Sequence, residues 1–302
     1  MKRLRIIKLL YIAFFFAIGS VLVIKKSKLA QDQLSIGAIP DQNPEKLNRL
    51  YKLLSSELSE SLDVRVRYKH VTNYSAAVTA FRTGDLDLVW FGGLTGVQAR
   101  HQKKGAQIIA QRDIDAKFQS VFIANTKSGI KPIKNIMDLK VIKGRRFTFG
   151  SESSTSGRLM PQYYLQKAGV KLTDLKGGQA GFSGSHDATI ALVQSGSYEV
   201  GSLNKQVWLA NVKQGRVDSS KLKVIWETPP YADYHWLAQP NIDKRFGKSF
   251  SEGLKKSFFS FSDKSPRQRK ILELFGAKKF IPAQIDQYKE IEQIGRQLGK
   301  IK

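Results

Sequence analysis

The sequence predicts an α/β protein built from two hinged lobes, and three observations support this prediction. Short strand patterns alternate with helical patterns, which is typical of parallel sheets with helices on their faces. The 302 residues are enough for two lobes of ordinary size. The alternation runs in two series, and short apolar strands near 121–126 and 224–228 join them, so we expect the hinges there.

The first series predicts a β-α-β-α-β order and therefore a parallel sheet. Its helix after Pro44 carries five apolar residues at helical spacing, and its last strand ends at Gly92-Gly93. The expected elements are a strand over 34–40, a helix from 44 onward, a strand over 64–68, a helix over 74–81 and a strand over 86–91.

The second series repeats this order and leads into a mostly helical tail over 250–301. The expected elements are a strand over 147–150, a loop over 151–157, helices over 158–167 and 188–193, a strand over 198–203, a helix around 207 and a strand over 223–226. The predicted division is a signal peptide or anchor over 1–30, a first lobe over 31–124, a second lobe over 125–224, and a return to the first lobe with the C-terminal helices over 225–302.

Composition and charge exclude several classes of protein. The absence of Cys excludes a disulfide framework, a thiolate metal site, a Cys nucleophile and a lipid-anchor Cys. The formal net charge of +25 first indicates nucleic acid. The positive charges are nevertheless scattered, with no basic tract and no nucleic-acid motif. We therefore expect no nucleic-acid partner, and a diffuse positive field that attracts small anions.

The N-terminus indicates export. Four basic residues (Lys2, Arg3, Arg5, Lys8) precede an apolar run over 9–24, which has the length of a signal h-region and is short for a spanning helix. Ala30 is a possible last residue of a signal peptide, but Lys28 is a poor partner three residues from that position. Cleavage and an uncleaved N-terminal anchor both remain open, and the expected location is periplasmic or extracytoplasmic.

The strongest local signal is a run of four hydroxyl residues, 153–156, followed by Gly157, between a strand and a helix. A helix N-terminus offers unpaired N–H groups and partial positive charge, so it binds anions readily. A single hydroxyl there would be an ordinary N-cap, whereas four in succession favour a ligand.

Two further sites are ambiguous from the residues alone. Thr95, after the paired glycines, could cap a helix or donate to an anion at the carboxyl end of a strand. His186 could be structural or could face a ligand. No second His stands at metal-ligand spacing from it, so we expect neither a metal nor another cofactor.

Several stretches resemble the phosphonate-binding periplasmic family of ABC transporters, over roughly residues 34–290. They are NYSAAVTAFRTGDLDLVWFGGLTGVQA at 73–99, FTFGSESSTSGRLMPQYYL at 147–165, GSHDATIALVQSGSYEVGSLN at 184–204 and VIWETPPYADYHW at 224–236. The resemblance implies a type II periplasmic-binding-protein fold with the ligand cleft between its two lobes. It also implies an exported solute-binding protein, expected as a monomer, that delivers a small oxyanion to an ABC transporter permease.

The resemblance also implies a set of ligand-binding residues. Ser154, Thr155 and Ser156 would hold the oxyanion, Tyr74 would contact it from the other lobe, and His186 matches an anion-contacting histidine of the family. Two positions depart from the aminoalkylphosphonate binders, since Phe118 replaces a tyrosine and Gln206 stands where the alignment places a glutamate that pairs with the ammonium group.

The same alignment retains Asp233 as a second acidic partner, although a gap of one residue affects this match. An aspartate facing an oxyanion requires a shared proton, which phosphite, phosphate and phosphonate supply near neutral pH and sulfate and selenate do not. We therefore expect a phosphorus oxyanion. The alternatives are a sulfate-like oxyanion such as selenate, and an anion-sensing receptor subunit. An enzyme is not expected, because there is no GxSxG elbow and no His–Asp order that suits a serine nucleophile.

Overall fold

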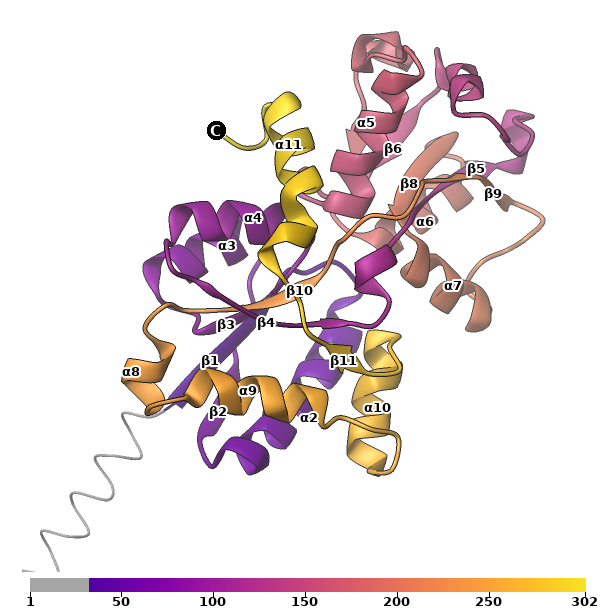
Figure 1. The fold of residues 1–302 in the computed structure, drawn as a ribbon. Coiled ribbons are helices and arrows are strands. Elements are labelled where there is room, and N and C mark those ends of the chain that lie inside the picture. The colour runs from indigo at the N-terminus through magenta and orange to yellow at the C-terminus, as the bar shows by residue number, and fades with distance from the viewer. Residues whose placement is uncertain (1–32) are drawn as a thin grey trace, which may run out of the picture.

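The computed structural model describes residues 33–302. The predicted signal peptide or anchor, 1–30, lies outside the described residues. The chain forms two α/β lobes, each built around one sheet (Figure 1). Within residues 33–302, no helix is long and apolar enough to span a membrane.

The first lobe contains a sheet of six strands in the order β11-β4-β10-β3-β1-β2. Strand β1 pairs in parallel with both β2 and β3, as the β-α-β-α-β pattern predicts, whereas β10 runs antiparallel to β3 and β4. The strands are β1 (Gln33–Ala38), β2 (Arg65–Tyr68), β3 (Leu88–Phe91), β4 (Gln107–Arg112), β10 (His235–Ala238) and β11 (Phe280–Ile281).

The second lobe contains a mixed sheet of five strands in the order β7-β6-β8-β5-β9. Strand β6 is parallel to β7 and β8, and β5 is antiparallel to β8 and β9. The strands are β5 (Ser120–Asn125), β6 (Phe147–Phe149), β7 (Gly181–Phe182), β8 (Val200–Asn204) and β9 (Leu222–Glu227).

Helices cover both sheets, and most of them follow the apolar periodicity of the sequence. Helix α2 buries the five apolar residues that predicted it, and Asn43 caps its N-terminus. The helices are α2 (Pro44–Leu62), α3 (Tyr74–Thr83), α4 (Gly93–Gln102), α5 (Met160–Lys167), α6 (His186–Gln194), α7 (Lys205–Lys213), α8 (Ile242–Phe246), α9 (Phe250–Phe259), α10 (Pro266–Phe275) and α11 (Lys289–Gln297).

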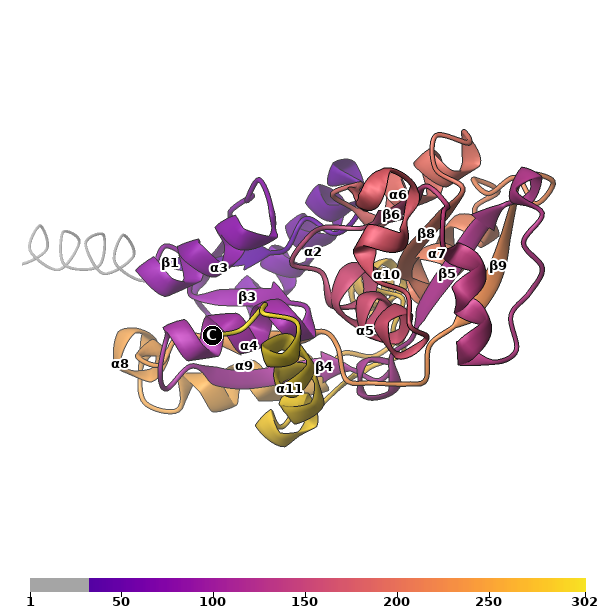
Figure 2. The same cartoon turned by 90° about the horizontal axis from the view of Figure 1, so that it is seen from above.

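Two segments connect the sheets, 113–119 from β4 to β5 and 228–234 from β9 to β10, and Figure 2 shows them between the lobes. The backbones of Phe118 and Tyr231 pair with each other where these segments run side by side. The expected hinges at 121–126 and 224–228 differ from this arrangement, because 121–125 belong to β5 and 224–227 to β9 of the second sheet. For the same reason, the predicted lobe boundaries at 124 and 225 fall inside β5 and β9 and not in the two connections.

A buried ion pair anchors the start of the first connection. The guanidinium of Arg112 contacts both carboxylate oxygens of Asp115, at 2.7 and 2.6 Å, and also donates to the carbonyl of Phe275. The backbone carbonyl of Asp115 in turn accepts from the N–H of Asp233 in the second connection. The two connections are therefore tied to each other and to α10 of the first lobe.

Candidate functional site

The hydroxyl run forms the start of a helix whose first turn is a π-helix over Thr155–Leu159, which continues directly into α5. The Ser154 hydroxyl caps this turn by accepting from the N–H of Gly157 at 2.9 Å. A Cβ on Gly157 would lie 3.0–3.3 Å from Ser154 Oγ and the backbone of Gly150, so a side chain there would require the cap or the Gly150 backbone to shift. π-Helical turns are frequent at functional sites, and in this one the Thr155 side chain reaches α4 of the first lobe.

The N-terminus of α4 in the first lobe meets this turn. The N–H of Leu94 donates to Thr155 Oγ1 at 3.0 Å, and the N–H of Gly93 donates to Asp233 Oδ1 at 2.8 Å. A Cβ on Gly92 would lie 3.2 Å from Thr155 Oγ1 and 3.3 Å from Asp233 Oδ1. The paired glycines thus allow two helix N-termini, one from each lobe, to approach the same point, where both favour negative charge.

Three polar atoms in this region lack a hydrogen-bond partner among the described residues: Tyr74 Oη, Ser156 Oγ and Asp233 Oδ2. Their side chains are buried, with 2%, 1% and 1% of the residue surface exposed. Buried polar groups in proteins are nearly always satisfied, so three such atoms beside two helix N-termini indicate a site for a small polar ligand. We call Tyr74, Ser154, Thr155, Ser156 and Asp233 the anion cluster.

The charge state of Asp233 is unusual. Burial raises the pKa of this carboxyl to about 7, although the Gly93 N–H and the Thr155 hydroxyl act in the opposite direction. The carboxyl therefore exchanges its proton near neutral pH, which suits a group that shares a proton with a bound oxyanion.

A second hydrogen-bond network lies beside the anion cluster and also joins the lobes. The Tyr234 hydroxyl donates to Asp41 Oδ2 at 2.9 Å, and it also contacts His186 Nε2 at 3.2 Å and Asn204 Nδ2 at 3.1 Å. Burial lowers the pKa of His186 to about 4 and raises that of Asp41 to about 6. His186 is therefore a neutral imidazole at pH 7.

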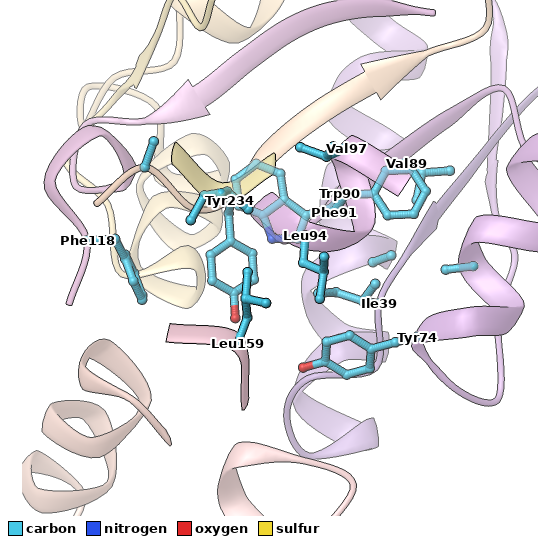
Figure 3. Close-up of a cluster of buried hydrophobic side chains, with 14 of the residues drawn as sticks. Ile39, Tyr74, Val89, Trp90, Phe91, Leu94, Val97, Phe118, Leu159 and Tyr234 are labelled. Atoms are coloured by element: carbon cyan, nitrogen blue, oxygen red, sulfur yellow. The ribbon is translucent and has the colours of Figure 1, made fainter. Parts of the chain in front are cut away.

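Aromatic side chains enclose this region. Tyr234 stacks on Trp90, and Arg112 lies over the rings of Trp90, Phe118 and Tyr234. Figure 3 shows Tyr74, Trp90, Phe118 and Tyr234 gathered with Leu159, which comes from the second lobe. The surroundings are apolar and buried, which strengthens every electrostatic interaction inside the site.

Three of the residues singled out in the sequence lie apart from the anion cluster or have local partners. The Thr95 hydroxyl donates to the carbonyl of Gly92 inside α4. Phe118 packs edge-on against Tyr231 and Tyr234 between the connecting segments. Gln206 lines a different cavity of about 530 Å³, together with Lys46 and other residues of α2, α7 and α10. These three roles in ligand binding remain predictions.

Sequence reasoning missed Tyr231, Tyr234 and Asp41. The Tyr231 hydroxyl contacts Ser120 Oγ at 2.6 Å and lies next to Ser156. Tyr231 and Tyr234 flank Asp233 in the stretch YADY, so their position beside a predicted ligand residue could have indicated that both rings lie next to the site. Asp41 follows β1 at the carboxyl end of a parallel strand, where ligands of open α/β sheets bind. In residues 33–302, no group of three His, Asp or Glu side chains is placed to hold a metal ion.

Comparisons with known proteins agree with this geometry. The family model for the periplasmic substrate-binding protein of phosphonate ABC transporters matches residues 36–288. The probable ABC transporter phosphite binding protein PhnD1 of Prochlorococcus marinus (strain MIT 9301) is 55% identical over 269 residues, which cover 89% of this chain and 91% of the relative. The phosphonates-binding periplasmic protein of Escherichia coli (strain K12) is 26% identical over 288 residues, covering 91% of this chain and 80% of that protein.

Solved structures give the same result. PhnD1 from Prochlorococcus marinus (MIT 9301) in complex with methylphosphonate superimposes with a TM-score of 0.88 at 55% identity, covering 90% of this chain and all of that one. The periplasmic aliphatic sulphonate binding protein SsuA of Escherichia coli has a TM-score of 0.60 at 16% identity, over 89% of this chain and 94% of that one, which shows the fold alone.

The fold and the interlobe site define a two-lobed solute-binding protein of the type II periplasmic class. The chain belongs to the phosphonate-binding family of periplasmic substrate-binding proteins, which are components of ABC transporters. It is therefore a substrate-binding component of an ABC transporter. The predicted fold class and the predicted class of function are both confirmed.

Proposed function

We propose that this chain captures a phosphorus oxyanion that carries one proton, namely phosphite, a small phosphonate such as methylphosphonate, or phosphate, and delivers it to a membrane permease. The observation that carries the proposal is the buried Asp233 carboxyl, with a pKa of about 7 and an oxygen without a partner among the described residues. A monoprotonated anion can donate its proton to this oxygen in a short charge-assisted bond.

The anion cluster supplies the remaining contacts. The Tyr74 and Ser156 hydroxyls lack partners among residues 33–302 and donate to the anion, while Ser154 caps the first turn of the helix with its N–H groups toward it, and Thr155 ties this turn to Leu94 of the first lobe. His186 is neutral, and its Nδ1 accepts from the N–H of Asn204, so Nε2 carries the proton and donates to the Tyr234 hydroxyl, which His186 orients beside the anion. We assign Tyr74, Ser154, Thr155, Ser156, His186 and Asp233 as the binding residues.

The proton on the ligand is the basis of selectivity. Sulfate and selenate have no proton near neutral pH, so they meet a protonated Asp233, and above the Asp233 pKa of about 7 this protonation costs about 1.4 kcal/mol more with each pH unit. An aminoalkylphosphonate requires a carboxylate for its ammonium group, and Gln206 is uncharged. Within the proposal, both groups of ligand bind more weakly than methylphosphonate or phosphite.

The relatives support the same class of ligand. The 55% identical PhnD1 is named a phosphite binding protein, and its solved structure contains methylphosphonate. We further propose that the binding unit is a monomer that works in the periplasm or an equivalent space, where residues 1–30 export it and, if uncleaved, tether it to the membrane.

Isothermal titration calorimetry with phosphite, phosphate, methylphosphonate, 2-aminoethylphosphonate, sulfate and selenate tests the proposal. We expect the tightest binding among the first three, and a rise in melting temperature with the same ligands, because they bind the folded state. Tightest binding of sulfate or selenate would transfer the function to the sulfate-like alternative. Binding of none of the six would refute an oxyanion carrier.

A further inference from the structure

A second set of contacts joins the lobes outside the anion cluster, at the N-terminus of α6. Two successive residues of this helix reach the segment that precedes α2 in the first lobe. The N–H of His186 donates to the carbonyl of Asp41 at 3.0 Å, and Oδ2 of Asp187 accepts from the N–H of Asn43 at 2.8 Å. Helix α6 packs on β5 and β8 of the second sheet, so these bonds form only where the two lobes are in contact.

The position of the Asp187 carboxylate is electrostatically favourable. Asn43 is the N-cap of α2, a helix of 19 residues, and its side chain already accepts from the N–H groups of Glu45 and Lys46. The N–H of Asn43 itself points out of the helix, where a carboxylate also meets the positive end of the helix dipole. The ammonium group of Lys46 also interacts electrostatically with the carboxylate of Asp187.

The second lobe holds this carboxylate in place. Oδ1 of Asp187 accepts from Asn211 Nδ2 of α7 at 3.0 Å, and Asn211 Oδ1 accepts from Arg216 at 2.7 Å. Both oxygens of Asp187 are therefore used, one within its own lobe and one across to the other lobe. A side chain that is fixed in one lobe and bonds to the other loses little entropy when the lobes meet.

We propose that Asp187 is an interlobe latch, a positioning residue that stabilises the closed form of the protein without contacting the anion. The proposal rests on the proposed function, since closure matters here because it traps the ligand. A ligand that is trapped only in the closed form has an apparent affinity proportional to the closed population. Loss of the latch therefore weakens every ligand by the same factor and acts mainly on the rate of dissociation.

Asp187→Asn tests the latch. The amide has one acceptor oxygen and cannot serve both Asn43 and Asn211. We expect the Kd for methylphosphonate to rise about tenfold, the factor that corresponds to one charge-assisted hydrogen bond. Stopped-flow tryptophan fluorescence should show that the rise comes from a faster koff. The order of preference among methylphosphonate, phosphite and phosphate stays the same, because the anion cluster is intact.

Asp218→Asn is the matched control. Asp218 lies in the same lobe and carries the same charge, but among the described residues its carboxylate bonds to Ser220 and Lys221 of that lobe and to none of the other lobe. We expect its Kd and koff to stay within twofold of the wild-type values. Equal losses in the two variants, or an Asp187→Asn loss that falls on kon, would show a general charge effect and overturn the latch.

A direct measurement of closure separates this proposal from the proposed function. The chain has no Cys, so spin labels on Lys52→Cys of α2 and Lys140→Cys of the second lobe, both exposed, report the distance between the lobes without interference. In the labelled protein, Asp187→Asn lowers the closed fraction without ligand, and closure then requires about tenfold more methylphosphonate than in the wild type. An unchanged closed fraction overturns the latch, whereas failure of the wild type to bind any oxyanion overturns only the proposed function.

Discussion

Asp233→Asn is the sharpest perturbation of the proposed site, because it removes one ionisable proton and almost no volume. In the free protein, the rise of the Asp233 pKa from 3.8 to about 7 corresponds to a cost of about 4 kcal/mol for the ionised carboxylate, at roughly 1.4 kcal/mol per pH unit. This cost is offset in the complex if the carboxylate accepts a proton from the anion. The Asn amide of the variant has no carboxylate oxygen that can accept the proton of the anion.

We expect the affinity for methylphosphonate to fall by about 1.5–3 kcal/mol in the variant, the scale of a hydrogen bond to a charged group. The pH dependence is more specific. The wild-type complex holds one proton between Asp233 and the anion, so above the pKa values of both groups that proton must come from the solvent. The Kd then rises about tenfold per pH unit, whereas the variant donates an N–H to the dianion and loses this dependence.

Calorimetry from pH 6 to 9, in pairs of buffers with different ionisation enthalpies, measures both the Kd and the protons taken up. One proton is taken up by the wild type near pH 9 and none by Asp233→Asn, which also gains affinity for sulfate. Asp41→Asn removes another buried carboxyl beside the site, one that already accepts from the Tyr234 hydroxyl, and we expect this variant to keep the tenfold rise in Kd per pH unit. A wild-type Kd that stays constant from pH 7 to 9, with no proton uptake, would refute the shared proton.

Three further outcomes follow from the same geometry. Tyr74→Phe lowers the affinity for the anion by about 1.5–3 kcal/mol. The free energy of unfolding of the ligand-free protein stays unchanged or rises slightly, because the hydroxyl has no partner among the described residues. Equal losses in calorimetry and in urea unfolding would contradict this. Thr155→Ala loses similar affinity and about 1 kcal/mol of stability, because its hydroxyl accepts from Leu94. Between pH 6.5 and about 4, His186 takes up a proton in the unfolded chain before it does so in the folded protein, so the free energy of unfolding falls as pH falls. His186→Gln should flatten this part of the urea-unfolding profile.

The sequence could predict the elements whose signals are local. Helix α2 follows from the spacing of its apolar residues after Pro44, and β6 and the hydroxyl run follow from a short apolar strand before 151–157. The fold class and the class of function followed from the resemblance to a family. Each of these signals lies within a stretch of contiguous residues, so no tertiary information was required.

Three elements escaped prediction because burial conceals their pattern. Strand β4 carries Gln111 and Arg112 at buried positions, where they bond to groups from the C-terminal part of the chain, so it lacks the apolar pattern of a core strand. Helix α4 is buried on most sides and begins with glycines, so it shows no amphipathic period. Strand β10 is a short stretch that follows the second connection, and it is recognised as a strand by its antiparallel pairing with β3 and β4.

The sequence by itself indicated the hydroxyl run as an anion site, and the resemblance to a family added Tyr74 and Asp233 as predicted ligands. The tertiary structure decided which of them meet. Asp233 is separated from Gly93 by 140 positions and from Thr155 by 78, and it reaches both only because the second connection returns beside the N-terminus of α4. The same burial sets its pKa near 7. Desolvation and hydrogen bonding depend on neighbours that are distant in sequence, and therefore only the folded chain fixes the charge of Asp233, on which the proposed selectivity rests.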